Sequence, residues 1–277
     1  MRKVQFILFV FALSIGGCTK VIDFDVSETN IRLVVDGSVT SEFKRHQVRL
    51  LKTASYFADK PAKVVSGADV SVSDGSKNWV FAEVPAGSGI YLSDSFAGQA
   101  GITYTLTVNS EDQLYTASET MLTGATLDSF DINQEFKPIP FENKTDSSFT
   151  VSVWGQEVGG VKNYYMWKLQ INSSPNFTDT LKNVNFLDDT GIDGVYIPGF
   201  PIYNVEKKYI HSGDTFSVLG YTITSRFYDF MRAILLETDW RGDNPWDGPP
   251  SNIPTNISNG AVGYFHASFV SKKTRVL

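Results

Sequence analysis

Three closely spaced carboxylates form one candidate metal-binding site in this sequence. Asp188, Asp189 and Asp193 lie in a short turn-like segment, and carboxylate oxygens are ligands that Ca²⁺ prefers. Counted from Asp189, acids occupy positions 1 and 5 of a calcium loop, and Gly194 occupies position 6. Position 12, which needs a bidentate acid, is Phe200, and position 3 offers no side-chain oxygen. The pattern therefore favours a solvated turn over a calcium site.

The histidines give no sign of a metal or catalytic centre. His46, His211 and His266 each lack a metal-ligating partner two or four residues further on. No nucleophile elbow, phosphate-binding loop or dinucleotide-binding fingerprint occurs in the chain. We therefore predict a protein without enzymatic activity and without a cofactor. The alternative is a hydrolase that assembles distant carboxylates, which requires two acids within about 5–10 Å of each other in a cleft.

Aromatic residues in a proline-rich stretch, 240–253, form a candidate binding surface. Trp240 and Trp246 stand among several prolines, and aromatic side chains on such a loop can stack on sugars or anchor a protein partner. An equally weighted interpretation is that both tryptophans fold back onto the end of the preceding helix. The two readings differ in whether this loop is exposed.

The only cysteine, Cys18, follows a leader with the organisation of an export signal. Arg2 and Lys3 precede an apolar run at 4–15, and two glycines stand just before the cysteine. The segment Ile15-Gly16-Gly17-Cys18 resembles the lipobox of bacterial lipoproteins, with Ile in place of the commoner Leu. The resemblance implies cleavage after residue 17 and attachment of acyl chains at Cys18. A buried free cysteine after an uncleaved signal anchor is the alternative.

Acyl chains at Cys18 are expected to hold the mature chain at a membrane, because each buried CH₂ contributes about 0.8 kcal/mol. Residues 19–25 loosely resemble the Lys-plus-acidic signal that sends Bacteroidota lipoproteins to the outer face of the outer membrane. The expected location is therefore the outer membrane, with the cell surface favoured over the periplasmic face. A formal charge of −6 without a basic run argues against nucleic acid as a partner.

Short strands separated by turns dominate residues 31–124, which we interpret as an antiparallel immunoglobulin-like β-sandwich. Residues 68–73 and 103–108 alternate apolar and polar side chains, as half-buried strands do. Residues 32–40 form a β-branched run, and Asp36-Gly37 in its middle indicates a bulge or bend. The fold class predicted from these patterns is mostly β.

Residues 125–277 are predicted to form a second, β-rich domain with one amphipathic helix. Strand-like segments occur at 127–132, 148–154, 164–171, 216–224 and 261–270. Apolar residues recur at helical spacing over about 225–238, with Ser225 as a plausible N-cap, and we expect the apolar face to pack on a sheet. A signal peptide at 1–17 and a lipidated tether at 18–30 complete the expected organisation.

Several segments of the mature chain resemble the family described as domain of unknown function 4249. The matching segments are 18–25, 33–40, 65–72, 89–91, 96–106, 225–230 and 256–265. They are turns and core strands and contain no catalytic signature. The resemblance implies a Bacteroidota lipoprotein whose gene commonly lies beside that of a TonB-dependent outer-membrane receptor.

By analogy with other pairs of receptor and lipoprotein, the resemblance implies a non-enzymatic accessory partner of such a receptor in nutrient capture. The membrane, through the lipid anchor, and the receptor are then the expected partners, with a small molecule or a glycan as the possible ligand. Two other functions stay open: the surface hydrolase with dispersed carboxylates, and a structural or adhesive envelope protein.

Overall fold

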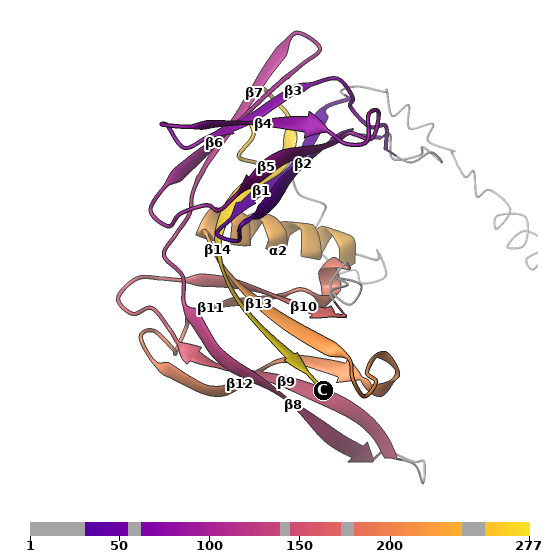
Figure 1. The fold of residues 1–277 in the computed structure, drawn as a ribbon, viewed down its shortest axis with the longest axis vertical. Helices are drawn as coiled ribbons and strands as arrows, with labels where there is room; N and C mark the ends of the chain where they lie inside the picture. The colour runs from indigo at the N-terminus through magenta and orange to yellow at the C-terminus, as the bar shows by residue number, and fades with distance from the viewer. Residues whose placement is uncertain (1–30, 55–61, 139–144, 173–179, 240–252) are drawn as a thin grey trace, which may run out of the picture. The chain divides into compact units, whose positions relative to one another are not determined.

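The computed structural model describes residues 31–54, 62–138, 145–172, 180–239 and 253–277, which fold mainly into β-strands (Figure 1). The first half contains β1 (Leu33–Thr40), β2 (Lys44–Lys52), β3 (Asp69–Ser73), β4 (Asn78–Glu83), β5 (Ile90–Phe96), β6 (Thr103–Ser110) and β7 (Gln113–Thr120). The second half contains β8 (Thr126–Pro138), β9 (Thr145–Gln156), β10 (Tyr164–Ile171), β11 (Asn185–Asp188), β12 (Tyr196–Glu206), β13 (Thr215–Ile223) and β14 (Val262–Val276). The helical elements within these ranges are α2 (Ser225–Asp239) and the short 3₁₀ helices η1 (Leu181–Asn183) and η2 (Lys207–Tyr209). The predicted mostly-β fold with one α-helix is confirmed.

The strands of the first half pack around one apolar core. They pair in the orders β1-β2-β5-β4 and β3-β6-β7, and β4 also pairs with β3. The alternation predicted for 68–73 and 103–108 is observed, because Val70, Val72, Tyr104 and Leu106 are all buried in this core. The two pairing orders suit a sandwich. The link between β4 and β3 joins them into one continuous ladder, however, and the immunoglobulin-like topology stays a prediction.

The bulge or bend expected at Asp36-Gly37 does not occur. Both residues pair in regular register with β2, Asp36 opposite Arg49 and Gly37 opposite Val48. The glycine is needed for packing instead of for a turn. A Cβ on Gly37 would lie 3.1 Å from the Val48 side chain and 3.3 Å from the ring of Phe265, which is closer than ordinary van der Waals contact.

The last strand, β14, belongs to both halves of the chain. It pairs in parallel with β1 over Val262–Ser268 and then antiparallel with β13 over Phe269–Val276, as the yellow strand in Figure 1 shows. Phe265 and Ala267 join the core of the first half, whereas Tyr264 on the opposite face joins the core beneath α2. Division into domains at residue 124 stays a prediction, and any such division assigns β14 to both parts.

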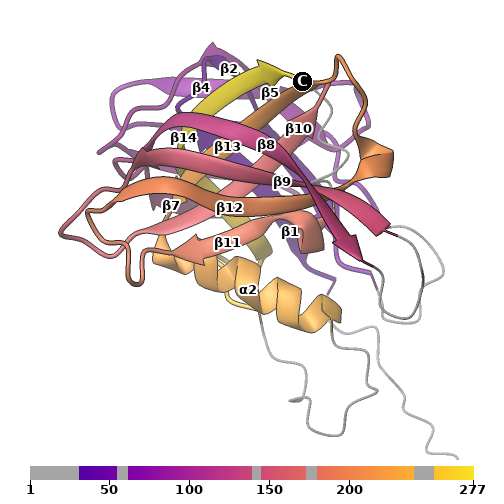
Figure 2. The same ribbon diagram turned by 90° about the horizontal axis from the view of Figure 1, so that it is seen from below.

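A separate three-stranded sheet, β12-β9-β8, closes a second core in the other half of the chain. Figure 2 shows this sheet lying over β10 and β13. Val151 and Val153 of β9 meet Leu169 of β10 and Phe216 and Val218 of β13, and all five side chains are at most 3 % exposed. This core fixes β10 and β13, which in turn support the face beneath α2.

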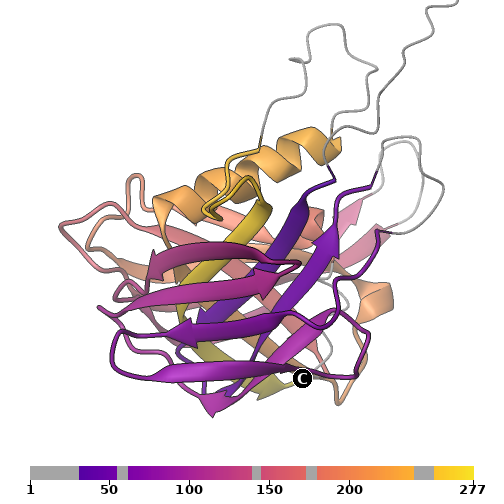
Figure 3. The same ribbon diagram turned by 90° about the horizontal axis from the view of Figure 1, so that it is seen from above.

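Helix α2 packs against β10 and β14, as expected for an amphipathic helix (Figure 3). Its observed bounds agree with the predicted 225–238 to within one residue. The N-cap is Thr224 and not Ser225, because the Thr224 hydroxyl accepts a hydrogen bond from the Phe227 amide at 3.3 Å. The Thr224 carbonyl also accepts from the Tyr228 amide at 3.0 Å. No helix within the described ranges has the length and apolar character needed to cross a bilayer.

Candidate functional site

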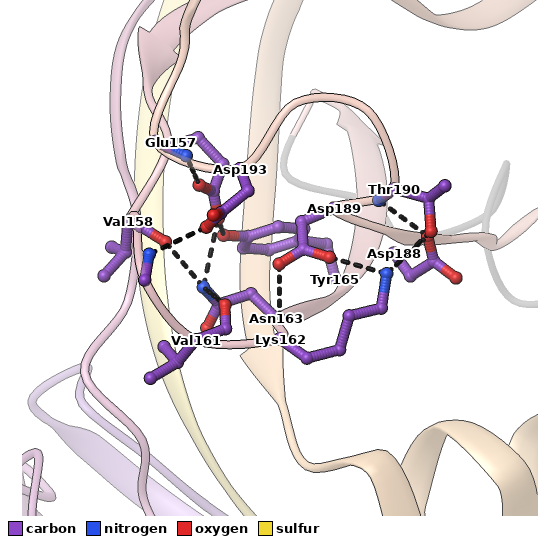
Figure 4. A network of polar contacts seen from close by, with 12 residues as sticks. Glu157, Val158, Val161, Lys162, Asn163, Tyr165, Asp188, Asp189, Thr190 and Asp193 are labelled. Atoms are coloured by element: carbon purple, nitrogen blue, oxygen red, sulfur yellow. Dashed lines mark hydrogen bonds and ion pairs between the residues drawn. The ribbon is translucent and has the colours of Figure 1, made fainter.

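Two of the three acids predicted as weak calcium ligands share one lysine (Figure 4). The Lys162 ammonium lies 2.6 Å from Asp189 Oδ1, 3.1 Å from Asp188 Oδ1 and 2.7 Å from the Thr190 hydroxyl. Hydrogen bonds from Thr190, together with Lys162, lower the pKa of Asp188 to about 2. The expected solvated turn is wrong for Asp189, whose side chain is buried at 3 % exposure and also accepts the Asn163 amide at 2.7 Å.

The third acid, Asp193, is not brought to the same point. Its carboxylate accepts the backbone amide of Gly160 at 2.8 Å and so ties two neighbouring loops together. Protein donors therefore already occupy all three carboxylates. Across the part of the chain that the structure describes, no group of three or more His, Cys, Asp and Glu has the geometry to hold a metal ion.

Glu157 is the central residue of this polar network, and the sequence patterns did not single it out. It is 2 % exposed, and its carboxylate accepts the Tyr165 hydroxyl at 2.6 Å, Asn163 Nδ2 at 3.1 Å and the Gly194 amide at 2.5 Å. Burial and the neighbouring Glu157 raise the pKa of the Tyr165 hydroxyl, so that it stays a donor. Every member of the network is satisfied by another member, which indicates a structural role in holding two loops at the ends of β9 and β11.

A cavity beneath α2, the α2 pocket, is the best candidate for a functional site. Its volume is about 550 Å³, within the range of about 300–1,000 Å³ that is typical of small-molecule sites. Phe227, Phe230, Met231 and Ile234 line it from α2, and residues of β1, β10, η1 and β14 form the facing walls. A second cavity, between the sheets of the second half, is only about 50 Å³, which is too small for a metabolite.

The sheet side of the α2 pocket carries four titratable side chains: Asp36 on β1, Lys168 on β10, and Tyr264 and His266 on β14. Burial raises the pKa of Asp36, against the opposing effect of the Lys168 and Arg49 charges. Burial also lowers the pKa of His266 to about 3, so its imidazole is neutral at physiological pH. Asp36 is exposed to solvent and His266 is half-buried. Two groups with shifted pKa values beside apolar side chains are the arrangement expected of a binding site.

Aromatic rings support the polar side of the pocket. His266 stacks on Phe227 with ring centroids 4.2 Å apart and an interplanar angle of 15°. The Tyr264 ring lies 5.1 Å from Phe227 and 5.0 Å from Phe230, and its hydroxyl donates to the buried carboxylate of Glu119 at 2.8 Å. Packing on both sides therefore fixes the positions of the rings that face the cavity.

The other histidines have ordinary roles. His46 is 1 % exposed, with Nε2 at 2.9 Å from the Phe96 carbonyl and Nδ1 near the Thr40 amide. His211 is exposed beside Asp214, with its Nδ1 3.5 Å from that carboxylate. Neither lines the α2 pocket.

Cys18, Trp240 and Trp246, the residues predicted for lipidation and for binding, lie outside the described residues. Ile253, the first described residue after 240–252, lines the α2 pocket. The sequence offered a partial signal for the pocket, since Asp36 is a charged residue inside a β-branched run. Nothing local connected it with His266 or Lys168.

Comparison with known proteins agrees with the family resemblance noted in the sequence. A search of curated proteins finds no match. The family model described as Domain of unknown function (DUF4249) matches residues 19–274 of the 277. The chain therefore belongs to the DUF4249 family.

Proposed function

We propose that this chain is a non-enzymatic lipoprotein of a Bacteroidota-type outer membrane, anchored by acyl chains on Cys18. It binds a small ligand in the α2 pocket and acts as the accessory partner of a TonB-dependent receptor in nutrient capture. The export leader and the lipobox-like segment before Cys18 support the anchor. The cell surface is the favoured location, on the basis of residues 19–25.

The observation that carries the binding function is the α2 pocket itself. It has the volume of a small-molecule site, apolar walls and a small number of polar groups. A hydrolase with paired carboxylates requires two acids within about 5–10 Å. Among the described residues that line this pocket, Asp36 is the sole carboxylate, which favours binding over hydrolysis.

The anchor gives the binding function a physical advantage. A lipoprotein confined to the membrane plane meets a receptor in the same membrane at a high effective concentration, so a weak interface is sufficient for transfer of a ligand. An anchored chain with a ligand pocket therefore suits capture beside a receptor. A purely structural or adhesive protein would not need a cavity of this size.

The partnership is tested by affinity purification of the tagged lipoprotein from its native membranes in mild detergent, followed by mass spectrometry. We expect a TonB-dependent β-barrel receptor to be enriched over the amount recovered with an unrelated lipoprotein. No enrichment over that control would contradict the partnership and favour the structural or adhesive alternative.

The anchor is tested separately with Cys18→Ala. This variant is expected to lose the mobility shift of acylation and to leave the membrane fraction, because the acyl chains that would hold it there are missing. A Cys18→Ala protein that is processed normally and stays firmly in the membrane would refute the lipid anchor. The result does not depend on the identity of the receptor.

A further inference from the structure

The neutral polar residues of the α2 pocket already have partners within the protein. The Tyr264 hydroxyl donates to the Glu119 carboxylate at 2.8 Å. Nδ1 of His266 lies 2.8 Å from the Ser268 hydroxyl, and the His266 ring is stacked on Phe227. Burial lowers the pKa of His266 to about 3, so this side chain carries no charge at physiological pH. Neither residue therefore requires a charged ligand.

The two charged residues of the lining do not depend on a ligand either. Asp36 is exposed to solvent, and the charges of Lys168 and Arg49 act on its carboxylate. The Lys168 ammonium lies 5.5 Å from the centroid of the Tyr221 ring, within the range of a cation–π contact. Water and protein groups therefore compensate both charges. We expect the pocket to select its ligand by its apolar wall and not by charge.

The apolar wall of the pocket follows two turns of α2. Four apolar residues on one stripe of the helix line the cavity: Phe227, Phe230, Met231 and Ile234. This stripe extends about 10 Å, at about 1.5 Å per residue. Apolar residues of other segments line the same cavity: Val34, Met166, Leu181 and Val184. Such a wall favours the burial of hydrocarbon, whereas the hydroxyls of a saccharide would be left unpaired on it.

Solvent reaches this apolar wall, so the cavity is open to a ligand from outside. Val34, Met231 and Ile234 are only half-buried, and Ile253, which lines the same cavity, is 36 % exposed. An amphiphile could place its hydrocarbon tail against these side chains and leave its polar head in water. Such a ligand buries apolar surface without burying an unpaired polar group.

The length of chain between the pocket and the proposed anchor specifies where this ligand would come from. Val34 of the pocket follows the first residue of β1, and residues 18–32 lead from Cys18 to that strand. A fully extended segment of this length spans at most about 55 Å. A chain acylated at Cys18 therefore keeps the pocket close to a bilayer, where amphiphiles with hydrocarbon tails are concentrated.

We propose that the α2 pocket binds the acyl chain of a single-chain lipid, such as a free fatty acid or a monoacylglycerol. The chain lies along α2, and its polar head stays in water at the open side of the cavity. The pocket recognises the hydrocarbon and is indifferent to the charge of the head. This inference rests on the proposed binding function and specifies the class of its ligand.

The test is photolabelling of the full chain in digitonin, a detergent without an alkyl chain. The probe is palmitate with a diazirine near the middle of its chain, and mass spectrometry identifies the labelled residues. We expect label on the stripe of α2 within 227–234 or on the walls that face it. Unlabelled palmitate and uncharged monopalmitoylglycerol are both expected to compete with the probe, whereas trileucine and maltose are expected not to.

Two variants at one position of the pocket test whether the label reports the cavity. Ile234→Trp fills the cavity and Ile234→Asp places a charge in it, and each is expected to lower the labelling by at least about tenfold. Leu236→Trp and Leu236→Asp are the matched controls, because Leu236 is on the same helix, 68 % exposed and absent from the lining. Both controls should be labelled like the wild type. Melting of each protein without the probe shows whether it is folded.

Equal labelling of the Ile234 variants and the wild type, or no labelling of α2 and its facing walls, would overturn the acyl-chain site. Competition by palmitate without competition by monopalmitoylglycerol would show that the head is recognised and would also overturn it. Labelling of Cys18→Ala but not of the wild type would place the protein's own anchor in the pocket, and the proposed ligand would then be wrong.

The two proposals fail in different ways. If no probe labels the pocket while the affinity purification still recovers the receptor, the ligand class is wrong and the partnership stands. If the pocket is labelled as expected and no receptor is recovered, the ligand class stands and the partnership is wrong.

Discussion

Replacing Glu157 with Gln is expected to destabilise the fold by about 2.5–6 kcal/mol. The carboxylate accepts hydrogen bonds on both oxygens: Tyr165 and Asn163 donate to Oε1, and the Gly194 amide donates to Oε2. A glutamine has one accepting oxygen, so at least one of these buried donors must face its NH₂ group. The cost combines a lost charge-assisted hydrogen bond, about 1.5–3 kcal/mol, with the desolvation of an unpaired donor, about 1–3 kcal/mol.

Tyr165→Phe removes one donor from the same carboxylate and leaves the other two in place. Its expected cost is about 1–2 kcal/mol, because no buried donor is left unpaired. In the Glu157→Gln background the same substitution should cost less, since the phenol hydroxyl is then one of the groups that can lose its acceptor. The two changes should therefore couple by about 1 kcal/mol in a double-mutant cycle.

Urea unfolding of the full chain, followed by tryptophan fluorescence and circular dichroism, measures these free energies. Glu206→Gln is the matched control, because Glu206 pairs with Lys208 at 2.6 Å while both side chains are more than 60 % exposed. It should change the free energy of unfolding by at most about 0.5 kcal/mol. A Glu157→Gln cost no greater than that of this control, or strict additivity with Tyr165→Phe, would refute the reasoning.

Three further predictions concern other parts of the fold. Gly263→Ala should lower the free energy of urea unfolding by at least about 3 kcal/mol. Gly263 has a φ of 97°, and a Cβ there would lie 2.0 Å from the Val35 carbonyl oxygen. A loss under about 1 kcal/mol would show that β14 can shift away from β1. Lys162→Met should lower the free energy of unfolding, because the buried Asp189 carboxylate loses its ion pair and keeps the Asn163 amide. Adding Asp189→Asn should recover most of that loss, and no recovery would contradict the pairing. Burial lowers the pKa of His46 to about 4, so the unfolded chain binds a proton that the folded chain does not. The free energy of unfolding should therefore fall as pH drops from about 6.5 to 4, by up to about 1.4 kcal/mol per pH unit from this group. In His46→Gln the free energy of unfolding should depend less on pH over the same range.

The elements that could be predicted are those whose signal is local. Alternation at 68–73 and 103–108 identified β3 and β6, and the helical spacing of apolar residues identified α2. β12 was not predicted, because Pro198, Gly199 and Pro201 remove the usual strand propensity. The strand forms nonetheless, since it is an edge strand that pairs with β9 alone and bulges near both prolines.

The pocket could not be predicted for a different reason. Asp36 looked like part of a bend, because Asp-Gly is common in turns, and only the crowding of Gly37 by Val48 and Phe265 explains why glycine is there. His266 looked isolated because its neighbours in space come from β1 and α2. The site depends on a parallel pairing between the first and last strands, and no short-range pattern reports such a pairing.

That pairing also determines when the pocket can exist during folding. Ser41 and Val270 are 229 positions apart in sequence, yet the Ser41 hydroxyl both accepts from the Val270 amide and donates to the Val270 carbonyl. Closing so long a loop costs conformational entropy before β14 gains any contact, so strands with short-range partners are favoured to form first. The β1 wall of the pocket, which includes Asp36, is complete only when β14 pairs with β1 and adds Tyr264 and His266. A chain that stops before Val262 would therefore keep many of its β-hairpins and lose the β14 wall of the α2 pocket.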